Sequence, residues 1–131
     1  MAGSSVTITK KSIKGLNRIK FVWVSDDAAG TASGATTFEV IGQPMQFITV
    51  PNGGGTAPTA LYDVTLKDEN GLDILNGLGA DRSATATETK KITDGLQTIV
   101  ATTLTLAVAA AGNSKGGTIY LDVATFDSQP L

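Results

Sequence analysis

Apolar residues recur at every second position in several short segments of this chain, and this period constrains the fold more than any other feature. In LYDVTLK, Tyr62, Val64 and Leu66 alternate with polar residues. The segments TTLTLAVA and GTIYLDVATF repeat the pattern. A period of two places successive side chains on opposite faces of a β-strand. The chain is therefore expected to build half-buried strands.

Glycine and proline separate these segments. The loops DDAAGTASGA, PNGGGTAP and GNSKGG each lie between alternating runs, and glycine allows the backbone to turn there. GNSKGG is expected to close a β-hairpin. Seven or eight short strands with such turns predict an all-β fold, an antiparallel β-sandwich or jelly roll. At 131 residues, the chain is expected to form one such domain over residues 1–131.

The alternating positions also predict the hydrophobic core. Its expected members are Phe21, Trp23, Phe38, Phe47, Tyr62, Val64, Leu66, Leu104, Leu106, Ile119, Leu121 and Val123. In RIKFVWVSD both strand faces are apolar, so Val22 and Val24 are expected to be covered as well. Trp23, the only tryptophan, is interpreted as a core residue rather than as a sugar-stacking platform.

Three segments are interpreted as long loops or arms. LGADRSATATETKKITDG shows no helical period, and residues 76–96 are therefore expected to form an extended excursion. Long segments of this kind are usually binding loops that become ordered on a neighbour. The basic N-terminal segment 1–15 and the C-terminal tail 125–131 are the other two candidate arms.

Composition excludes most catalytic and metal chemistry. The chain has no histidine and no cysteine, which removes imidazole bases, thiolates and most transition-metal ligand sets. A net charge of -2 argues against extensive nucleic-acid binding. No apolar run approaches the length of a membrane span or an export signal. We expect a protein made in the cytoplasm, with no cofactor and no membrane or nucleic-acid partner.

The basic residues cluster near the start of the chain. Five of the ten, Lys10, Lys11, Lys14, Arg18 and Lys20, precede residue 21. Lysines can guard a strand edge against pairing with another chain, or they can contact an acidic protein surface. Phosphate binding is the least favoured interpretation, because interleaved aromatic residues are missing. The candidate partner contacts are Lys10, Lys11, Lys14, Arg18, Arg82, Lys90 and Lys91.

The stretch DVTLKDENGLDILNG concentrates acidic residues around two glycines. It fails as an EF-hand loop, since Leu72 and Asp73 occupy the fifth and sixth positions counted from Asp68. Asn70 and Gly71 instead favour a two-residue hairpin turn. Asp68 and Asp73 would then face each other as a weak candidate cation pair. A catalytic carboxylate pair would need a cleft that no sequence feature indicates.

Charged residues make up only 17% of the chain, against about 25% in typical globular proteins. Threonine, alanine, serine and glycine take their place, which favours a surface that lies against other protein. The glycine-rich runs GNSKGG and NGGGT lack the helix that follows a phosphate-binding loop. The composition therefore favours a protein-binding role over nucleotide chemistry.

The run VPNGGGTAPTALYDVTLKDENGLDILNGLGADRSATATE, followed by LTLAVAAAGNSKGGTIYLDV, resembles a group of small virion proteins of tailed bacteriophages. The resemblance covers about residues 15–123. Its most specific parts are PTALYDVTLKDENGLDIL and AAAGNSKGG. It carries over no catalytic motif. It implies a non-enzymatic capsid decoration or cement protein of jelly-roll type, bound to the major capsid protein on the exterior of the virion.

This resemblance implies that residues 1–20 and 76–96 contact the capsid shell, and a symmetric shell favours a dimer or trimer of the bound protein. Two other functions stay open. A tail or neck structural protein would share the same fold and composition. A host or carbohydrate adhesion module would need exposed aromatic rings, for which Tyr62, Tyr120 and Phe126 are candidates. An enzyme would have to rely on carboxylates alone.

Overall fold

The computed structural model describes residues 4–92 and 100–124, and the prediction of an all-β fold is confirmed there. These residues form nine β-strands and one short 3-10 turn, η1 (Gly54–Thr56). The strands are β1 (Ser5–Ile13), β2 (Leu16–Val24), β3 (Ala32–Ala35), β4 (Val40–Pro51), β5 (Asp63–Lys67), β6 (Glu88–Lys91), β7 (Val100–Thr102), β8 (Thr105–Ala109) and β9 (Gly116–Ala124).

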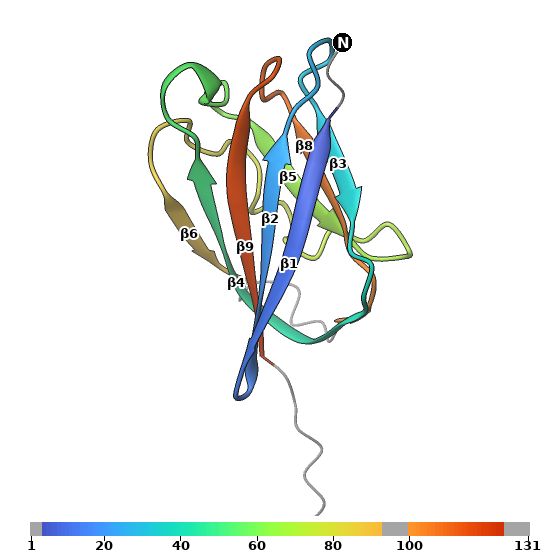
Figure 1. Cartoon of the computed structure of the whole chain (residues 1–131). Coiled ribbons are helices and arrows are strands. Elements are labelled where there is room, and N and C mark those ends of the chain that lie inside the picture. The colour runs from blue at the N-terminus through green and yellow to red at the C-terminus, as the bar shows by residue number, and fades with distance from the viewer. Residues whose placement is uncertain (1–3, 93–99, 125–131) are drawn as a thin grey trace, which may run out of the picture.

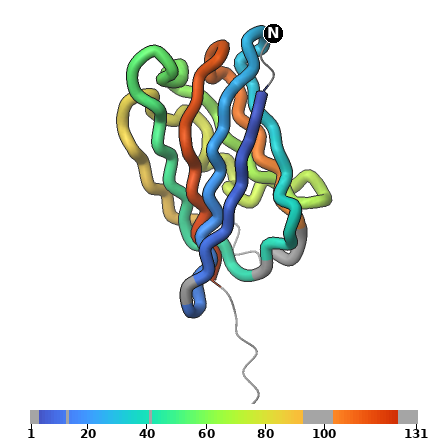
Figure 2. The backbone as a smooth tube through the Cα atoms, in the orientation of Figure 1, coloured from blue at the N-terminus to red at the C-terminus, as the bar shows by residue number. Residues whose placement is uncertain are grey.

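The strands build two antiparallel sheets that face each other as a β-sandwich (Figure 1). The larger sheet has the order β1-β2-β9-β4-β6, with β7 paired to the first residues of β4. The smaller sheet has the order β3-β8-β5. In the backbone trace (Figure 2), β1 and β2 form a ribbon that extends past the ends of the neighbouring strands.

The strand pairs are nested along the sequence. β2 pairs with β9, β3 with β8, and β4 with β7 and β6, so from β2 onward each early strand meets a late one, whereas β1 pairs with its neighbour in the sequence, β2. One long antiparallel ribbon of this kind, folded over so that successive pairs fall in alternate sheets, is the winding of a jelly roll. The prediction of an antiparallel β-sandwich or jelly roll is therefore confirmed.

The core lies between the two sheets and follows the predicted alternation. Of the twelve predicted core residues, all but Phe38 are buried, and Phe38 packs against the core while half-buried. Sequence alternation missed several buried residues because they lie in short or irregular segments. These include Ile74, Leu75, Ile92 and Ala111.

The outer side of β2 departs from the prediction. Val22 and Val24 are 38% and 39% exposed, whereas Phe21 and Trp23 on the inner side are fully buried. The larger sheet has a partner layer on one side only, so its second face is open to solvent even where β2 carries apolar residues. The expectation that both faces of this strand are covered was wrong.

A buried threonine organises one of the places where the chain passes between sheets. The β3-to-β4 connection and the β7-to-β8 connection run side by side there, joined by a 2.9 Å hydrogen bond from Thr36 N to Leu104 O. Thr36 Oγ1 accepts from Leu104 N at 3.0 Å and donates to the Phe38 carbonyl at 2.8 Å. The side chain thus supplies hydrogen bonds that neither sheet ladder provides at this corner.

A buried serine does the same at a second crossing, between the β2-to-β3 and β8-to-β9 connections. Ser25 Oγ donates to Gly112 O at 2.6 Å and accepts from Lys115 N at 2.9 Å. Ser25 N also donates to Lys115 O at 2.8 Å. The loop GNSKGG therefore joins strands of different sheets, and the prediction that it closes a hairpin was wrong.

Close backbone approach fastens β1 to the smaller sheet. A Cβ atom on Gly34 of β3 would lie 2.6 Å from Val6 Cβ of β1, which is far inside the van der Waals contact distance. Only glycine lets β3 come this near to the edge strand. Val6 and Ile8 pack partly buried against the core from this side.

Two of the expected arms are largely part of the sandwich. Ser5–Ile13 pairs with β2 along its whole length as β1, so this part of segment 1–15 is an edge strand. Within 76–92, β6 pairs with β4, and Ile92 N donates to Met45 O at 2.8 Å. Residues 1–3, 93–96 and 125–131 of the expected arms lie outside the described residues.

Thr36→Val tests the hydroxyl at the sheet crossing. The substitution preserves the branched shape but leaves Leu104 N and Phe38 O without their side-chain partner in a buried place. We expect a loss of about 1 to 3 kcal/mol in the free energy of unfolding, measured by urea denaturation. Thr37→Val, at the adjacent exposed position, is the control and should change stability by less than about 0.5 kcal/mol. Equal effects of the two substitutions would contradict the assigned role.

Candidate protein-binding face

The outer side of the larger sheet carries two rows of paired residues that run across five strands. The register places the first row as Lys11, Arg18, Asp122, Gln46 and Lys91, and the second as Thr9, Lys20, Tyr120, Ile48 and Thr89. We call these ten residues the outer basic face. Four basic side chains and one carboxylate give it a net charge of +3.

Asp122 lies at the centre of the first row and holds its neighbours in place. Arg18 Nε and Nη2 donate to its two carboxylate oxygens at 2.7 and 2.9 Å. Gln46 Nε2 donates to Asp122 Oδ2 at 2.8 Å from the other side. Asp122 is only 3% exposed as a residue, and these two side chains cover its carboxylate. A bidentate arginine contact of this kind fixes orientation as well as charge.

The contact shifts the ionisation of both partners. Hydrogen bonds from Arg18, followed by one from Gln46, lower the pKa of Asp122, although burial acts in the opposite direction. The hydrogen bonds that Arg18 donates to Asp122 in turn raise the pKa of Arg18. Asp122 therefore remains ionised across neutral pH and neutralises Arg18. The uncompensated positive charge of the face belongs to its lysines.

A hollow of about 520 Å³ lies over the β1 and β2 side of this face. Its walls include Lys11, Lys20 and Leu16, and Tyr120 contributes an aromatic ring. The Arg18 guanidinium lies 5.1 Å from the centre of that ring, a distance at which a cation is attracted to the aromatic π-system. The hollow thus combines free ammonium groups with apolar surface.

An apolar patch continues the same side of the sheet beyond the basic rows. Val22 of β2 pairs with Thr118 of β9, which in turn pairs with Val50 of β4, and Val24 pairs with Gly116 of β9. The two β2 valines are more than a third exposed. Uncharged β-branched side chains beside a basic region are typical of surfaces that contact protein rather than water alone.

The predicted contact residues divide between this face and other places. Lys11, Arg18 and Lys91 lie on the outer basic face. Lys10 points the other way, with its ammonium group 5.0 Å from the centre of the Phe38 ring, and Lys14 lies in the tight turn between β1 and β2. Lys90 pairs with Phe47 and so faces the opposite side of β6 from Lys91.

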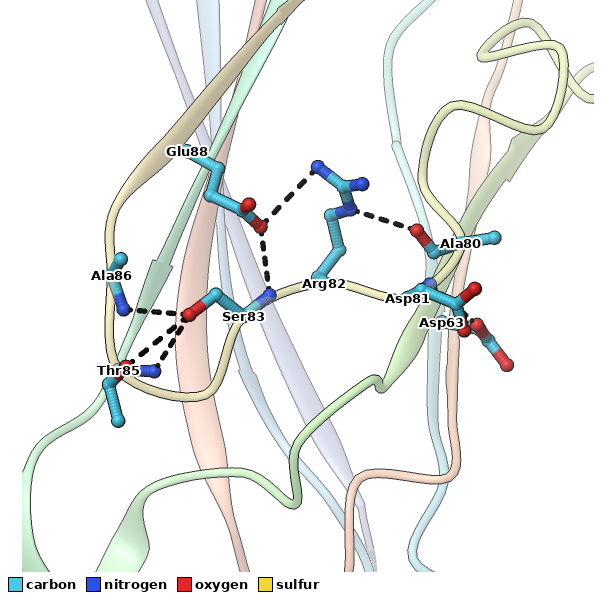
Figure 3. A network of polar contacts seen from close by, with 8 residues as sticks. All are labelled: Asp63, Ala80, Asp81, Arg82, Ser83, Thr85, Ala86 and Glu88. Carbon is cyan, nitrogen blue, oxygen red and sulfur yellow. Dashed lines mark hydrogen bonds and ion pairs between the residues drawn. The ribbon is translucent and has the colours of Figure 1, made fainter.

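Arg82 is a structural residue and was wrongly placed among the surface contacts. It is only 8% exposed, and its Nη1 lies 3.4 Å from Glu88 Oε1 of β6. Its Nε donates to Ala80 O at 3.1 Å, and its backbone nitrogen donates to Tyr62 O at 2.7 Å. Figure 3 shows the side chain reaching from its loop toward β6. Arg82 thus connects β6, at the edge of the larger sheet, to Tyr62, which precedes β5.

The network around Arg82 orders the segment that was expected to be an arm. Glu88 Oε1 also accepts from Ser83 N at 2.8 Å, and Ser83 Oγ accepts from Ala86 N at 3.0 Å. On the other side, Asp81 N donates to Asp63 Oδ1 of β5 at 2.9 Å (Figure 3). Polar side chains here bind neighbouring backbone, which explains why a segment without apolar periodicity still packs.

The candidate cation pair, Asp68 and Asp73, does not have the expected arrangement. Asp68 accepts from Asn70 N and Leu72 N at 2.8 and 3.0 Å, which closes a three-residue turn in which Gly71 has φ of 83°. Asp73 instead pairs with Lys67 across the ladder. The predicted two-residue turn was therefore wrong, and the two carboxylates are not cross-strand neighbours.

Asp73 binds backbone amides that lie before and after this turn. Its carboxylate accepts from Leu66 N, Leu75 N and Gly77 N, each at 3.1 Å. Within residues 4–92 and 100–124, no three acidic side chains gather as a metal-binding group. In the same part of the chain, no helix has the length and apolarity to cross a membrane.

Seven of the ten residues of this face are absent from the predicted contacts, among them Lys20, Gln46, Tyr120 and Asp122. Lys20 could have been included, since it alternates with Ile19 and Phe21 and so had to face outward. Gln46 had no such signal, because it follows a bulge between Pro44 and Gln46 that shifts the register. The pairing of Arg18 with Asp122 joins residues 104 positions apart.

Comparisons with protein-family models, with curated proteins and with solved structures found no match to this chain.

Asp122→Asn tests the central ion pair. Because the folded-state pKa of Asp122 lies below its unfolded value of about 3.9, its contribution to stability is present above that pH and is lost as pH falls through the folded pKa. We expect the variant to lose about 1 to 3 kcal/mol at pH 7, toward the lower end because the Arg18 side chain is 41% exposed.

The difference between parent and Asp122→Asn should then shrink as the pH is lowered below about 4, measured by urea denaturation across pH. Asp26, whose pKa is also lowered by backbone hydrogen bonds to its carboxylate, keeps some acid sensitivity in both proteins. Glu69→Gln, at an exposed turn position, controls for the loss of one negative charge. A constant difference at all pH values would contradict the assignment.

Proposed function

We propose that this chain is a non-enzymatic structural protein of a tailed-bacteriophage virion that decorates the capsid and stabilises it. Its partner is the major capsid protein lattice on the exterior of the particle. The observation that carries the proposal is the outer basic face, a charged and partly apolar surface presented by a sheet whose other side is the core. The sequence resemblance to phage virion proteins supplies the class of partner.

The physical demands on a cement protein agree with this fold. A protein that binds the assembled shell but not its separated subunits stabilises the shell by mass action at every contact. Its binding surface must keep its shape, and here each residue of the two rows lies on a paired strand of the larger sheet. On a symmetric lattice the bound copies would cluster as dimers or trimers.

The edge-guarding interpretation explains only part of the basic cluster. β1 is an edge strand of the larger sheet, so Lys10 and Lys11 can prevent pairing with another chain. Lys20 and Arg18 lie on β2, an interior strand between β1 and β9, and edge protection gives no reason for them. A contact surface accounts for both strands together.

The aromatic residues give sugar binding less support than the outer basic face gives a structural role in the head. Trp23 and Tyr62 are fully buried, with ring centres 5.6 Å apart, so neither offers a stacking platform. The ring of Tyr120 is already in contact with Arg18. Phe126 lies outside the described residues. We therefore retain the structural role in the head as the proposal, with the tail or neck as outcomes of its test.

Cosedimentation with purified heads and, separately, with isolated tails of the same phage tests the proposal. Because β1 is an integral strand, deleting the first ten residues would damage the sheet, and point substitutions are the sharper tool. We expect saturable binding to heads in numbers that match the lattice. Lys11→Gln combined with Lys20→Gln should weaken it about fivefold to tenfold, since exposed ion pairs contribute roughly 0.2 to 1 kcal/mol each.

The matched control is Lys67→Gln, an exposed lysine on β5 of the other sheet, which should leave head binding unchanged. Binding to tails alone would move the protein to the tail or neck. Binding to neither particle would contradict a virion role.

A further inference from the structure

We infer that the outer basic face binds an extended acidic segment of a partner protein, with carboxylates over its lysines and apolar side chains over the adjoining valines. This inference deepens the proposed function and rests on it for the identification of the partner as a shell protein. The chemistry of the bound segment is argued from the face itself.

The unpaired positive charge on the face comes from lysines. These lysines are far enough apart for each to meet a different carboxylate. Arg18 already forms an ion pair with Asp122, whereas Lys11, Lys20 and Lys91 are exposed. Lys11 and Lys20 come from neighbouring strands and adjacent rows, and both line the hollow. A ligand that places several carboxylates along its length complements this arrangement, because each ammonium group is a compact positive charge that can meet one carboxylate without the fixed two-pronged geometry of arginine.

The apolar component favours a polypeptide over a nucleic acid. Leu16 lines the hollow. Val22 and Val24 lie beyond Arg18 and Lys20 along the same side of β2, and each is more than a third exposed. An acidic peptide can bury apolar side chains on these residues while its carboxylates meet the lysines. A phosphate backbone has no comparable group, and the one ring among the described residues that line the hollow, that of Tyr120, already lies against Arg18.

The charge distribution of the molecule also disfavours a long polyanion. The β1 and β2 strands with their turn, residues 5–24, contain five basic residues and no acidic one, whereas residues 63–81 contain five acidic residues and one lysine. A short acidic segment can remain on the basic side. A long polyanion would extend toward the repulsive acidic region, and its affinity would need more neutralised phosphates than this face offers.

A fluorescein-labelled, capped peptide in which glutamates alternate with valine and serine tests the inference. Fluorescence anisotropy gives the affinity, and backbone amide chemical shifts of the protein locate the peptide even when binding is weak. We expect saturable binding with shifts concentrated at Lys11, Lys20 and Tyr120. The Lys11→Gln and Lys20→Gln double variant should bind about fivefold to tenfold more weakly, while Lys67→Gln should bind as the parent does.

Two further probes complete the test. The same peptide with glutamine in place of every glutamate should not bind, and a single-stranded DNA oligonucleotide should bind more weakly than the acidic peptide. Tighter binding of the oligonucleotide through the same lysines would overturn the inference in favour of general polyanion binding. Undiminished peptide binding by the double variant, or absence of shifts on the face, would overturn it as well.

Competition separates this inference from the proposed function. If the protein binds heads but excess acidic peptide does not displace it, the inference fails and the capsid role stands. If the acidic peptide binds the face but heads do not bind the protein, the capsid role fails and the ligand chemistry stands. Displacement from heads by the acidic peptide, and not by its glutamine counterpart, supports both.

Discussion

Two buried hydroxyl groups hold the places where the chain passes between the sheets, and the rest of the structure depends on these crossings. A sheet ladder cannot satisfy the backbone where strands leave one layer for the other, and unpaired buried amides are costly. Thr36 Oγ1 and Ser25 Oγ provide the missing partners, binding Leu104 N and Lys115 N respectively. Each hydroxyl joins two connections that are far apart in the sequence. At each crossing, the two connections therefore stabilise each other.

The crossings determine which surface is available for binding. Because the core fills the space between the layers, the larger sheet has one face left for solvent or a partner. The β1-β2 ribbon, fastened to β3 by the close approach at Gly34, adds two strands of basic residues to that face. Asp122 then fixes Arg18 and Gln46 at its centre, which leaves the lysines as the groups free to meet acidic protein.

Period-two alternation predicted the fold class and most of the core because burial on one face is a local property of each strand. It failed for Val22 and Val24, since a strand with two apolar faces looks the same whether or not a second layer covers it. It also failed for the segment 76–92, where Arg82 and Glu88 replace apolar periodicity by polar contacts. A run of charged and small residues gives no sign of such contacts.

The candidate site could be predicted only in part for a related reason. The basic residues of β1 and β2 are adjacent in the sequence and were recognised as a group. Asp122 and Gln46 join them only through strand register, and the bulge at Pro44 and Gln46 sets part of that register. Likewise, a two-residue turn was expected at Asn70 and Gly71, but the structure has a three-residue turn there. Asp68 stabilises it by accepting hydrogen bonds from two of its backbone amides.

Native-state hydrogen exchange, followed by NMR at increasing denaturant, tests the central role of the crossings most directly. The amides of Leu104 and Lys115 donate to the two hydroxyls, and that of Ile119 lies in the middle strand β9. If the crossings hold the sandwich together, all three amides exchange only through global unfolding, with the same free energy of opening. Rapid, denaturant-independent exchange of Leu104 and Lys115 while Ile119 stays protected would contradict the account.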